Sequence, residues 1–280
     1  MVTTRRDILL GTGASLAIGA LPAAARALQP DADIQSNRRL VMNGLLEQTI
    51  EAHGGLKRWN ELESVTAHLD EGGGLWALTG HPDMVGETNV TVGTRSEWAS
   101  HHPFLADRSR TRFEPSKVTI VDGKGTLIEE LNEPRASFAS LSPGTPWSKA
   151  QLAYFAGYAM WTYLNLPFSL VRQGVVTEEG ATWEENGETL RRLHIRFPAT
   201  IATHSTNQTL YIDSAGLLKR HDYDVEISGG TPAAHYPSRY QKIGGIMFPT
   251  RRDIFPRQPD NTPDRNVLVV SIDLSNFELK

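Results

Sequence analysis

The segment spanning residues 152–164 limits most strongly how this chain of 280 residues can fold. It predicts a helix, because Thr145 and Pro146 provide a cap and a first-turn residue and Pro167 stops the pattern. A helix without a polar face must be covered on most sides, so we expect it inside, or across the mouth of, a curved sheet. Its aromatic residues either pack as core or face a ligand. Apolar side chains surround this predicted helix at Leu152, Tyr154, Phe155, Ala156, Tyr158, Ala159, Met160, Trp161, Tyr163 and Leu164.

Most of the remaining chain predicts short strands with turn residues between them. No crossover helix separates the runs of the last third, so neighbouring strands should be antiparallel. An amphipathic helix, capped by Ser36 or Asn37 and ended by Gly54 and Gly55, should precede them. The predicted fold class is therefore α+β, with a strongly curved antiparallel sheet, or half-open barrel, that encloses the apolar helix. The predicted strands are 65–69, 90–94, 97–101, 110–113, 118–121, 126–130, 190–197, 207–213, 217–227, 235–243, 246–255 and 267–274.

The first 27 residues predict a signal peptide of the twin-arginine type. Arg5 and Arg6 stand ahead of an apolar run that ends at the small-residue cleavage site 25–27, and an ordinary Sec signal is the alternative. Residues 28–35 read as a linker and 36–280 as a single domain. We therefore expect export by the Tat machinery and a periplasmic or secreted location. No later apolar run is long enough for a transmembrane anchor.

Composition and missing motifs exclude several classes of function. The sequence has no cysteine, which removes disulfides, thiolate metal sites, thiol nucleophiles and a lipid-modified cysteine. Its 28 basic and 32 acidic residues give a net charge of -4, which argues against a nucleic-acid partner. The mature sequence contains no nucleophile elbow, zinc-protease motif, phosphate loop or dinucleotide fingerprint. We expect no cofactor and no metal.

Histidine and tyrosine placement gives the candidate site. Along 217–227, alternation puts Lys219, His221 and Tyr223 on the more apolar face, so His221 and Tyr223 should point inward, with Arg220 and Asp222 outward. Inward imidazoles could act as acids or bases, or could be core histidines with a backbone partner. The catalytic candidates are His221, His204, His235 and Tyr223. The candidate ligand-binding residues are Phe155, Tyr158 and Trp161 as the wall, with His221, Tyr223 and His235 as polar anchors.

Three further residues have simpler interpretations. His53 lies at a predicted helix end, where a cation would complement the helix dipole. Arg251 and Arg252 could bind an anionic group or lie on the outer face of the sheet.

Two groups of short sequence motifs resemble known proteins. The phrases 210–213, 216–218 and 244–250, with the predicted signal peptide and the central apolar helix, resemble the lipoprotein carrier (LolA/LolB-like) fold. The resemblance covers 36–280 in layout and implies an unclosed barrel with an apolar interior. The phrases 101–104, 152–164 and 201–205 are similar to uncharacterised exported bacterial proteins, and this second likeness implies no activity.

Three functions remain open at this stage. The first is binding of a hydrophobic or amphipathic small molecule or lipid in the concave interior of the sheet. The second is an exported enzyme that acts on a small hydrophobic substrate by His/Tyr acid–base chemistry. The third is a structural or partner-binding protein of the cell envelope, which would expose an apolar patch in place of a cavity.

Overall fold

The computed structural model describes residues 44–84, 86–141 and 144–280. The predicted signal peptide (1–27), the linker (28–35) and the start of the predicted first helix lie outside this part of the chain. No helix in the described ranges combines the length and apolarity that a membrane span requires.

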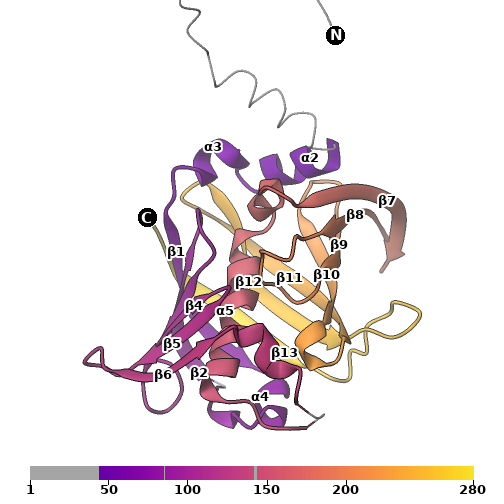
Figure 1. Ribbon diagram of the computed structural model, residues 1–280. Coiled ribbons are helices and arrows are strands. Elements are labelled where there is room, and N and C mark those ends of the chain that lie inside the picture. Colours follow the sequence, from indigo (N-terminus) through magenta and orange to yellow (C-terminus); the bar gives the residue numbers. More distant parts are fainter. Residues whose placement is uncertain (1–43, 85, 142–143) are drawn as a thin grey trace, which may run out of the picture. The chain divides into compact units, whose positions relative to one another are not determined.

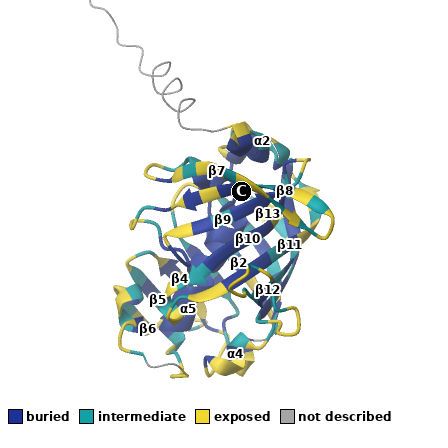
Figure 2. Cartoon of the chain, turned by 90° about the vertical axis from the view of Figure 1, so that its right-hand side faces the viewer, coloured by how far each residue is buried: buried dark blue, intermediate teal, exposed yellow. Residues whose placement is uncertain are grey.

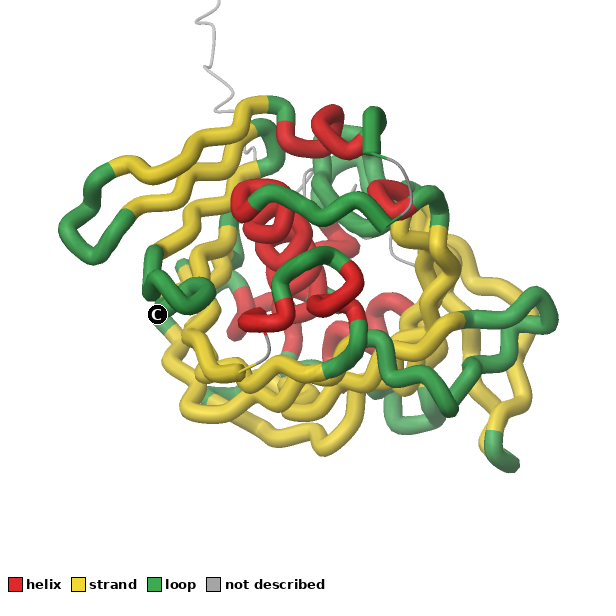
Figure 3. The backbone as a smooth tube through the Cα atoms, turned by 90° about the horizontal axis from the view of Figure 1, so that it is seen from below, coloured by secondary structure: helices red, strands yellow, loops and turns green. Residues whose placement is uncertain are grey.

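The described residues build one sheet of thirteen antiparallel strands in the order β6-β5-β4-β3-β2-β1-β13-β12-β11-β10-β9-β8-β7. The sheet does not close, because β6 and β7 are its two edges, and it curves around the helices (Figures 1 and 3). The predicted fold class is confirmed. The strands are β1 (Ser64–Gly72), β2 (Gly86–Gly93), β3 (Ala99–His102), β4 (Arg110–Glu114), β5 (Lys117–Val121), β6 (Leu127–Asn132), β7 (Val176–Glu185), β8 (Glu188–Arg196), β9 (Asn207–Ile212), β10 (Leu218–Val225), β11 (Thr231–Ile243), β12 (Ile246–Pro256) and β13 (Val270–Leu279).

The two halves of the sheet meet where β1 pairs with β13. Val65 lies opposite Leu279 and Glu71 opposite Ile272, so this junction runs along the whole of β1. Buried residues follow the middle strands, whereas β6 has none (Figure 2).

Helix α5 (Lys149–Asn165) is the predicted apolar helix, and the sheet covers it. It begins at Lys149, so Thr145 and Pro146 are not its cap and first turn. Ser148 is the N-cap, because its hydroxyl accepts from the backbone N–H of Gln151 at 3.1 Å while the Gln151 side chain accepts from the N–H of Ser148 at 2.9 Å.

One face of α5 packs directly against the strands before it. Gly157 lies so close to Phe113 on β4 that a Cβ atom there would overlap the Phe113 side chain. Trp161 donates from Nε1 to the carbonyl of Gly93 on β2 at 2.9 Å. Gly157 and Trp161 therefore belong to the face of α5 that packs on β2 and β4.

Helix α2 (Gly44–Ala52) lies within the predicted first helix, but the charge predicted at its end was wrong. Gly54, with φ of 119°, ends α2 as expected. His53 is buried and its Nδ1 lies 2.8 Å from the carbonyl of Thr49. Burial lowers the pKa of His53 to about 4, so the predicted cation at this helix end is a neutral imidazole. The helical segments beside α5 are α2 (Gly44–Ala52), α3 (Gly55–Trp59), α4 (Leu75–Leu78), η1 (Pro82–Met84), η2 (Pro134–Phe138), η3 (Phe168–Val171) and η4 (Glu226–Ser228).

A bulge in β10 changes the predicted alternation. The register with β9 shifts between Leu218 and Arg220, so Leu218 is buried and Lys219 is exposed, contrary to prediction. Beyond the bulge His221 points inward as predicted. Arg220 points to the other face, but it is buried there with Asp222, to which it donates from Nε at 2.7 Å. That face of β10 is therefore not open to water.

Candidate functional site

A cavity of about 890 Å³ lies beside the face of α5 that does not pack on β2–β4. Its walls come from α4, η2, α5 and η4 and from strands β1 and β10–β13. Helix α5 contributes a stripe at i, i+1, i+4, i+5 and i+8, which is one side of a helix. The stripe consists of Phe155, Ala156, Ala159, Met160 and Tyr163.

Most of the cavity wall is apolar, with the aromatic side chains of Trp76, Trp147, Phe138, Phe155 and Phe255 prominent. Trp147 and Phe155 contact each other with ring centroids 5.2 Å apart, and Phe138 meets Trp147 edge to face at 5.3 Å. Such a wall stabilises apolar ligand surface by about 25 cal/mol per Å² removed from water.

A buried chain of hydroxyl and imidazole groups reaches the cavity. The Tyr163 hydroxyl lies 2.6 Å from the Tyr223 hydroxyl and 2.8 Å from His204 Nε2, and the Tyr158 hydroxyl lies 3.2 Å from His204 Nδ1. Burial lowers the pKa of His204 and raises the pKa of Tyr163 and Tyr223, so all three are uncharged.

This hydrogen-bond chain contains three hydroxyl protons and one imidazole proton, and it forms three hydrogen bonds. One hydroxyl proton, at one end, is therefore left over. The spare O–H belongs to Tyr158 when the chain donates from Tyr223 toward His204, and to Tyr223 when it runs the other way. Tyr223 lines the cavity. It can therefore either accept from or donate to a group in the cavity.

His221 and His235 lie behind this chain. His221 Nε2 is 2.6 Å from Gln208 Oε1, and since that amide oxygen only accepts, the imidazole donates. Burial lowers the pKa of His221 to about 3 and that of His235 well below its usual range. His235 Nε2 lies 3.3 Å from Arg252 Nη1.

Arg252 is fully buried on the inner side of β12, so the interpretation that it lies on the outer face was wrong. Its Nη2 donates to the carbonyl of Tyr163 at 2.7 Å. Tyr163 is in the last turn of α5, where the partial negative charge of the helix dipole favours a cation. Burial lowers the pKa of Arg252 to about 10, so it remains charged at neutral pH. Among the described residues it has no carboxylate partner.

Glu71 is a site residue that was not predicted from the sequence. It lines the cavity and is only 4% exposed, yet its carboxyl group makes no hydrogen bond or ion pair with any described residue. Burial, with a smaller effect of Asp70, raises the pKa of Glu71 to about 8. The signal was present, because Glu71 continues the inward alternation of Ala67 and Leu69 on β1.

The structure divides the predicted site residues into two groups. Phe155, Tyr223 and His204 line the cavity. Among the described residues, the lining does not include Tyr158, Trp161, His221 or His235. Trp161 belongs to the packed face of α5, whereas the other three surround Tyr163 and His204 from behind. The catalytic and binding roles of all these residues stay predictions.

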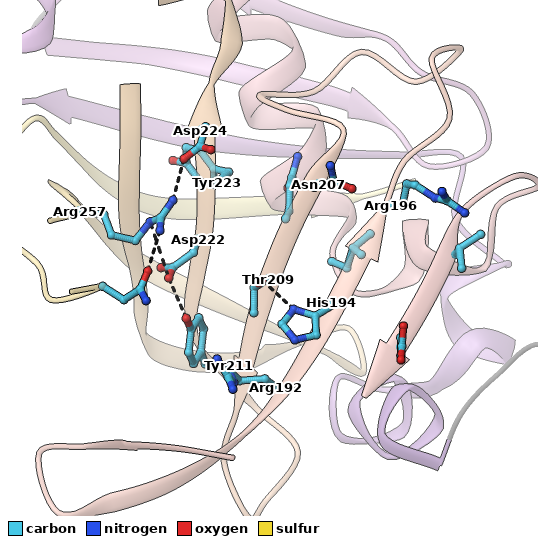
Figure 4. A pocket seen from close by; sticks show the side chains of 15 residues that line it. Arg192, His194, Arg196, Asn207, Thr209, Tyr211, Asp222, Tyr223, Asp224 and Arg257 are labelled. Atoms are coloured by element: carbon cyan, nitrogen blue, oxygen red, sulfur yellow. Dashed lines mark hydrogen bonds and ion pairs between the residues drawn. The ribbon is translucent and has the colours of Figure 1, made fainter. Parts of the chain in front are cut away.

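A second pocket, of about 520 Å³, opens on the other face of β7–β10 and is mainly polar (Figure 4). Most of its charged groups already have partners. Arg257 donates to Asp224 at 2.6 Å, the Tyr211 hydroxyl donates to Asp222 at 2.8 Å, and His194 lies 3.1 Å from Thr209. In the described part of the chain, no cluster of three or more histidine or acidic side chains is placed to hold a metal.

No family model and no curated protein matches the sequence. Solved structures with a similar fold include a DUF1329 family protein from Desulfovibrio piger, with 11% identity and a TM-score of 0.48 over 84% of this chain and 92% of that one. A LolA superfamily protein from Nitrosomonas europaea has 11% identity and a TM-score of 0.45 over 80% of this chain and 91% of that one. The LolA superfamily, to which this second neighbour belongs, is the family that the sequence resembles.

Proposed function

We propose that the protein is exported and binds a hydrophobic or amphipathic small molecule or lipid in the cavity beside α5. The observation that carries this proposal is the combination of about 890 Å³ of space, an aromatic wall and a few polar groups at defined positions. Small-molecule sites have this composition and size. Ala156 and Ala159 support the proposal, because larger side chains at these helix positions would fill the space.

The test is native mass spectrometry of the mature protein from its own periplasm, followed by solvent extraction. We expect an extractable bound mass in the wild-type protein and its loss in Ala159→Phe, which fills part of the cavity. Ala136→Phe in η2 is the matched control, since Ala136 is exposed and outside the lining. Circular dichroism checks that both variants fold. An unchanged bound mass in a folded Ala159→Phe protein, or no bound mass in the wild type, would contradict constitutive binding.

The chain Tyr223–Tyr163–His204 favours a second candidate, an exported enzyme that acts on a small hydrophobic substrate. Through Tyr163, this hydrogen-bond chain can relay a proton between a substrate at Tyr223 and His204. If this function holds, turnover of a hydrophobic ester should fall in Tyr163→Phe while substrate binding remains. Absence of turnover over a panel of hydrophobic esters and amides would count against it.

A further inference from the structure

We propose that the cavity recognises an amphipathic amine, an apolar molecule with one ammonium group, and that the carboxyl group of Glu71 pairs with that ammonium. This inference rests on the proposed binding function and specifies the chemical class of its ligand.

Glu71 is the only acidic residue deep in the cavity wall of the described chain. Its neighbours in the sheet supply no countercharge, since Gly86 lies opposite it on β2 and Ile272 on β13. Asp70 is adjacent but points to the exposed face. A buried carboxyl without a partner destabilises the fold, whether it is charged or leaves a neutral acid without hydrogen bonds. A ligand cation would give it the missing partner.

The other charges around the cavity do not offer a site for an anion. Arg135 lines the cavity, but it pairs with Glu226 and donates to the carbonyl of Thr203 at 2.9 Å. Arg252 lies behind Tyr163 and interacts with the last turn of α5. A carboxylate or phosphate in the cavity would therefore meet Glu71 with no free cation among the described lining residues. The acidic group without a partner among these lining residues is Glu71, and an ammonium ligand would pair with its carboxylate once the proton is released.

Two further features fit an ammonium group. The electron-rich faces of aromatic rings attract cations, and Trp76 and Phe155 both line the cavity, with ring centroids 6.2 Å apart. The hydroxyl oxygen of Tyr223 can accept from an ammonium N–H when the hydroxyl chain donates toward His204. His204 stays neutral because burial and the charge of Arg135 lower its pKa, so it adds no competing positive charge.

The experiment compares three probes with the same alkyl chain: dodecylamine, dodecanol and dodecanoate. Binding is followed at neutral pH, below the micelle concentrations, by the change in tryptophan fluorescence, since two of the six tryptophans, Trp76 and Trp147, line the cavity. We expect dodecylamine to bind about tenfold or more tightly than the other two probes. Glu71→Gln should remove this preference while the affinity for dodecanol stays nearly the same.

Glu97→Gln is the matched control. Burial raises the pKa of Glu97 to about 8 as well, but Glu97 does not line the cavity, so its variant should keep the preference for the amine. Calorimetry in buffers of different ionisation enthalpy should also show a proton released on amine binding to the wild type and none in Glu71→Gln. Equal affinities for the three probes, or a preference that survives Glu71→Gln, would overturn the inference and leave the binding function standing. If none of the probes binds, the proposed function fails together with it.

Discussion

Glu71 and Glu97 each have a buried carboxyl oxygen without a hydrogen-bond partner, and of the two only Glu71 lines the cavity. The pKa of Glu71 is about 8 in the folded chain, against an ordinary value of 4.5. Between these two pH values the Glu71 carboxyl group is therefore protonated in the folded state and ionised in the unfolded state. It follows that the contribution of Glu71 to the free energy of unfolding decreases as the pH rises from about 4.5 to about 8.

Glu71→Gln removes this titration. Relative to the wild type, the variant should gain stability through this pH window, by up to about 1.4 kcal/mol per pH unit, and the gain should level off above about pH 8. Urea unfolding at several pH values measures it. Glu97→Gln should show a change of the same sign, since the pKa of Glu97 is also raised to about 8. A constant difference between Glu71→Gln and the wild type at all pH values would show that Glu71 does not titrate in this range.

Individual residues also mark how far the sequence could be interpreted. Alternation along β10 correctly predicted that His221 points inward, but it placed Lys219 inside, because a bulge cannot be seen in a pattern of period two. The same alternation along β1 places Glu71 on the inner face. It was not predicted as a site residue, because a carboxyl group is not expected on a buried face. The buried position of Arg252 could not be predicted, because its hydrogen-bond partner, the carbonyl of Tyr163, lies 89 positions away in the chain.

Helix α5 shows the same limit for a whole element. Its apolar composition correctly predicted a covered helix, yet it could not distinguish the face that packs on β2–β4 from the face that lines the cavity. Strand β7 was not predicted, since its residues are mostly exposed and show no apolar alternation. Its position comes from pairing with β8, which a local pattern does not contain.

Gly157 provides a test of how tightly α5 packs. At an open helix position, glycine to alanine would stabilise by about 1 kcal/mol. A Cβ atom at residue 157 would overlap Phe113, and overpacking of this kind costs about 1–3 kcal/mol. We therefore expect Gly157→Ala to lower the free energy of unfolding, as measured in urea.

The control is the same substitution in a Phe113→Gly background, because the Cβ of Phe113 is the nearest atom to the added methyl group and only glycine removes it. There Gly157→Ala should be neutral or stabilising. Destabilisation of equal size in both backgrounds would mean that the contact with Phe113 is not the cause.

At the scale of the molecule, an unclosed sheet leaves two strands with unpaired edges, β6 and β7. Such edges can pair with another chain unless charges discourage it. Both are rich in glutamate, with Glu129 and Glu130 on β6 and four glutamates on β7. On β6 this charge is next to Leu127 and Ile128, which are 55% and 48% exposed. The acidic residues thus protect an otherwise apolar edge.

Glu129→Val should increase self-association, seen as a larger apparent mass in light scattering as the protein concentration rises. Asp70→Val is the control, because Asp70 is exposed on β1, a strand with partners on both sides. It adds similar apolar surface without an open edge and should leave the mass unchanged. The same association in both variants would attribute the effect to hydrophobicity alone.

The junction between β1 and β13 has a consequence for synthesis of the chain. Strand β1 ends at Gly72 and its partner begins at Val270, so the ribosome must add nearly 200 residues before β1 can acquire this neighbour. At translation rates of about 5–20 residues per second, this takes roughly 10–40 s. During that time β1 has an exposed edge in the middle of the future sheet, and an exposed edge of this kind can pair with another chain until β13 covers it.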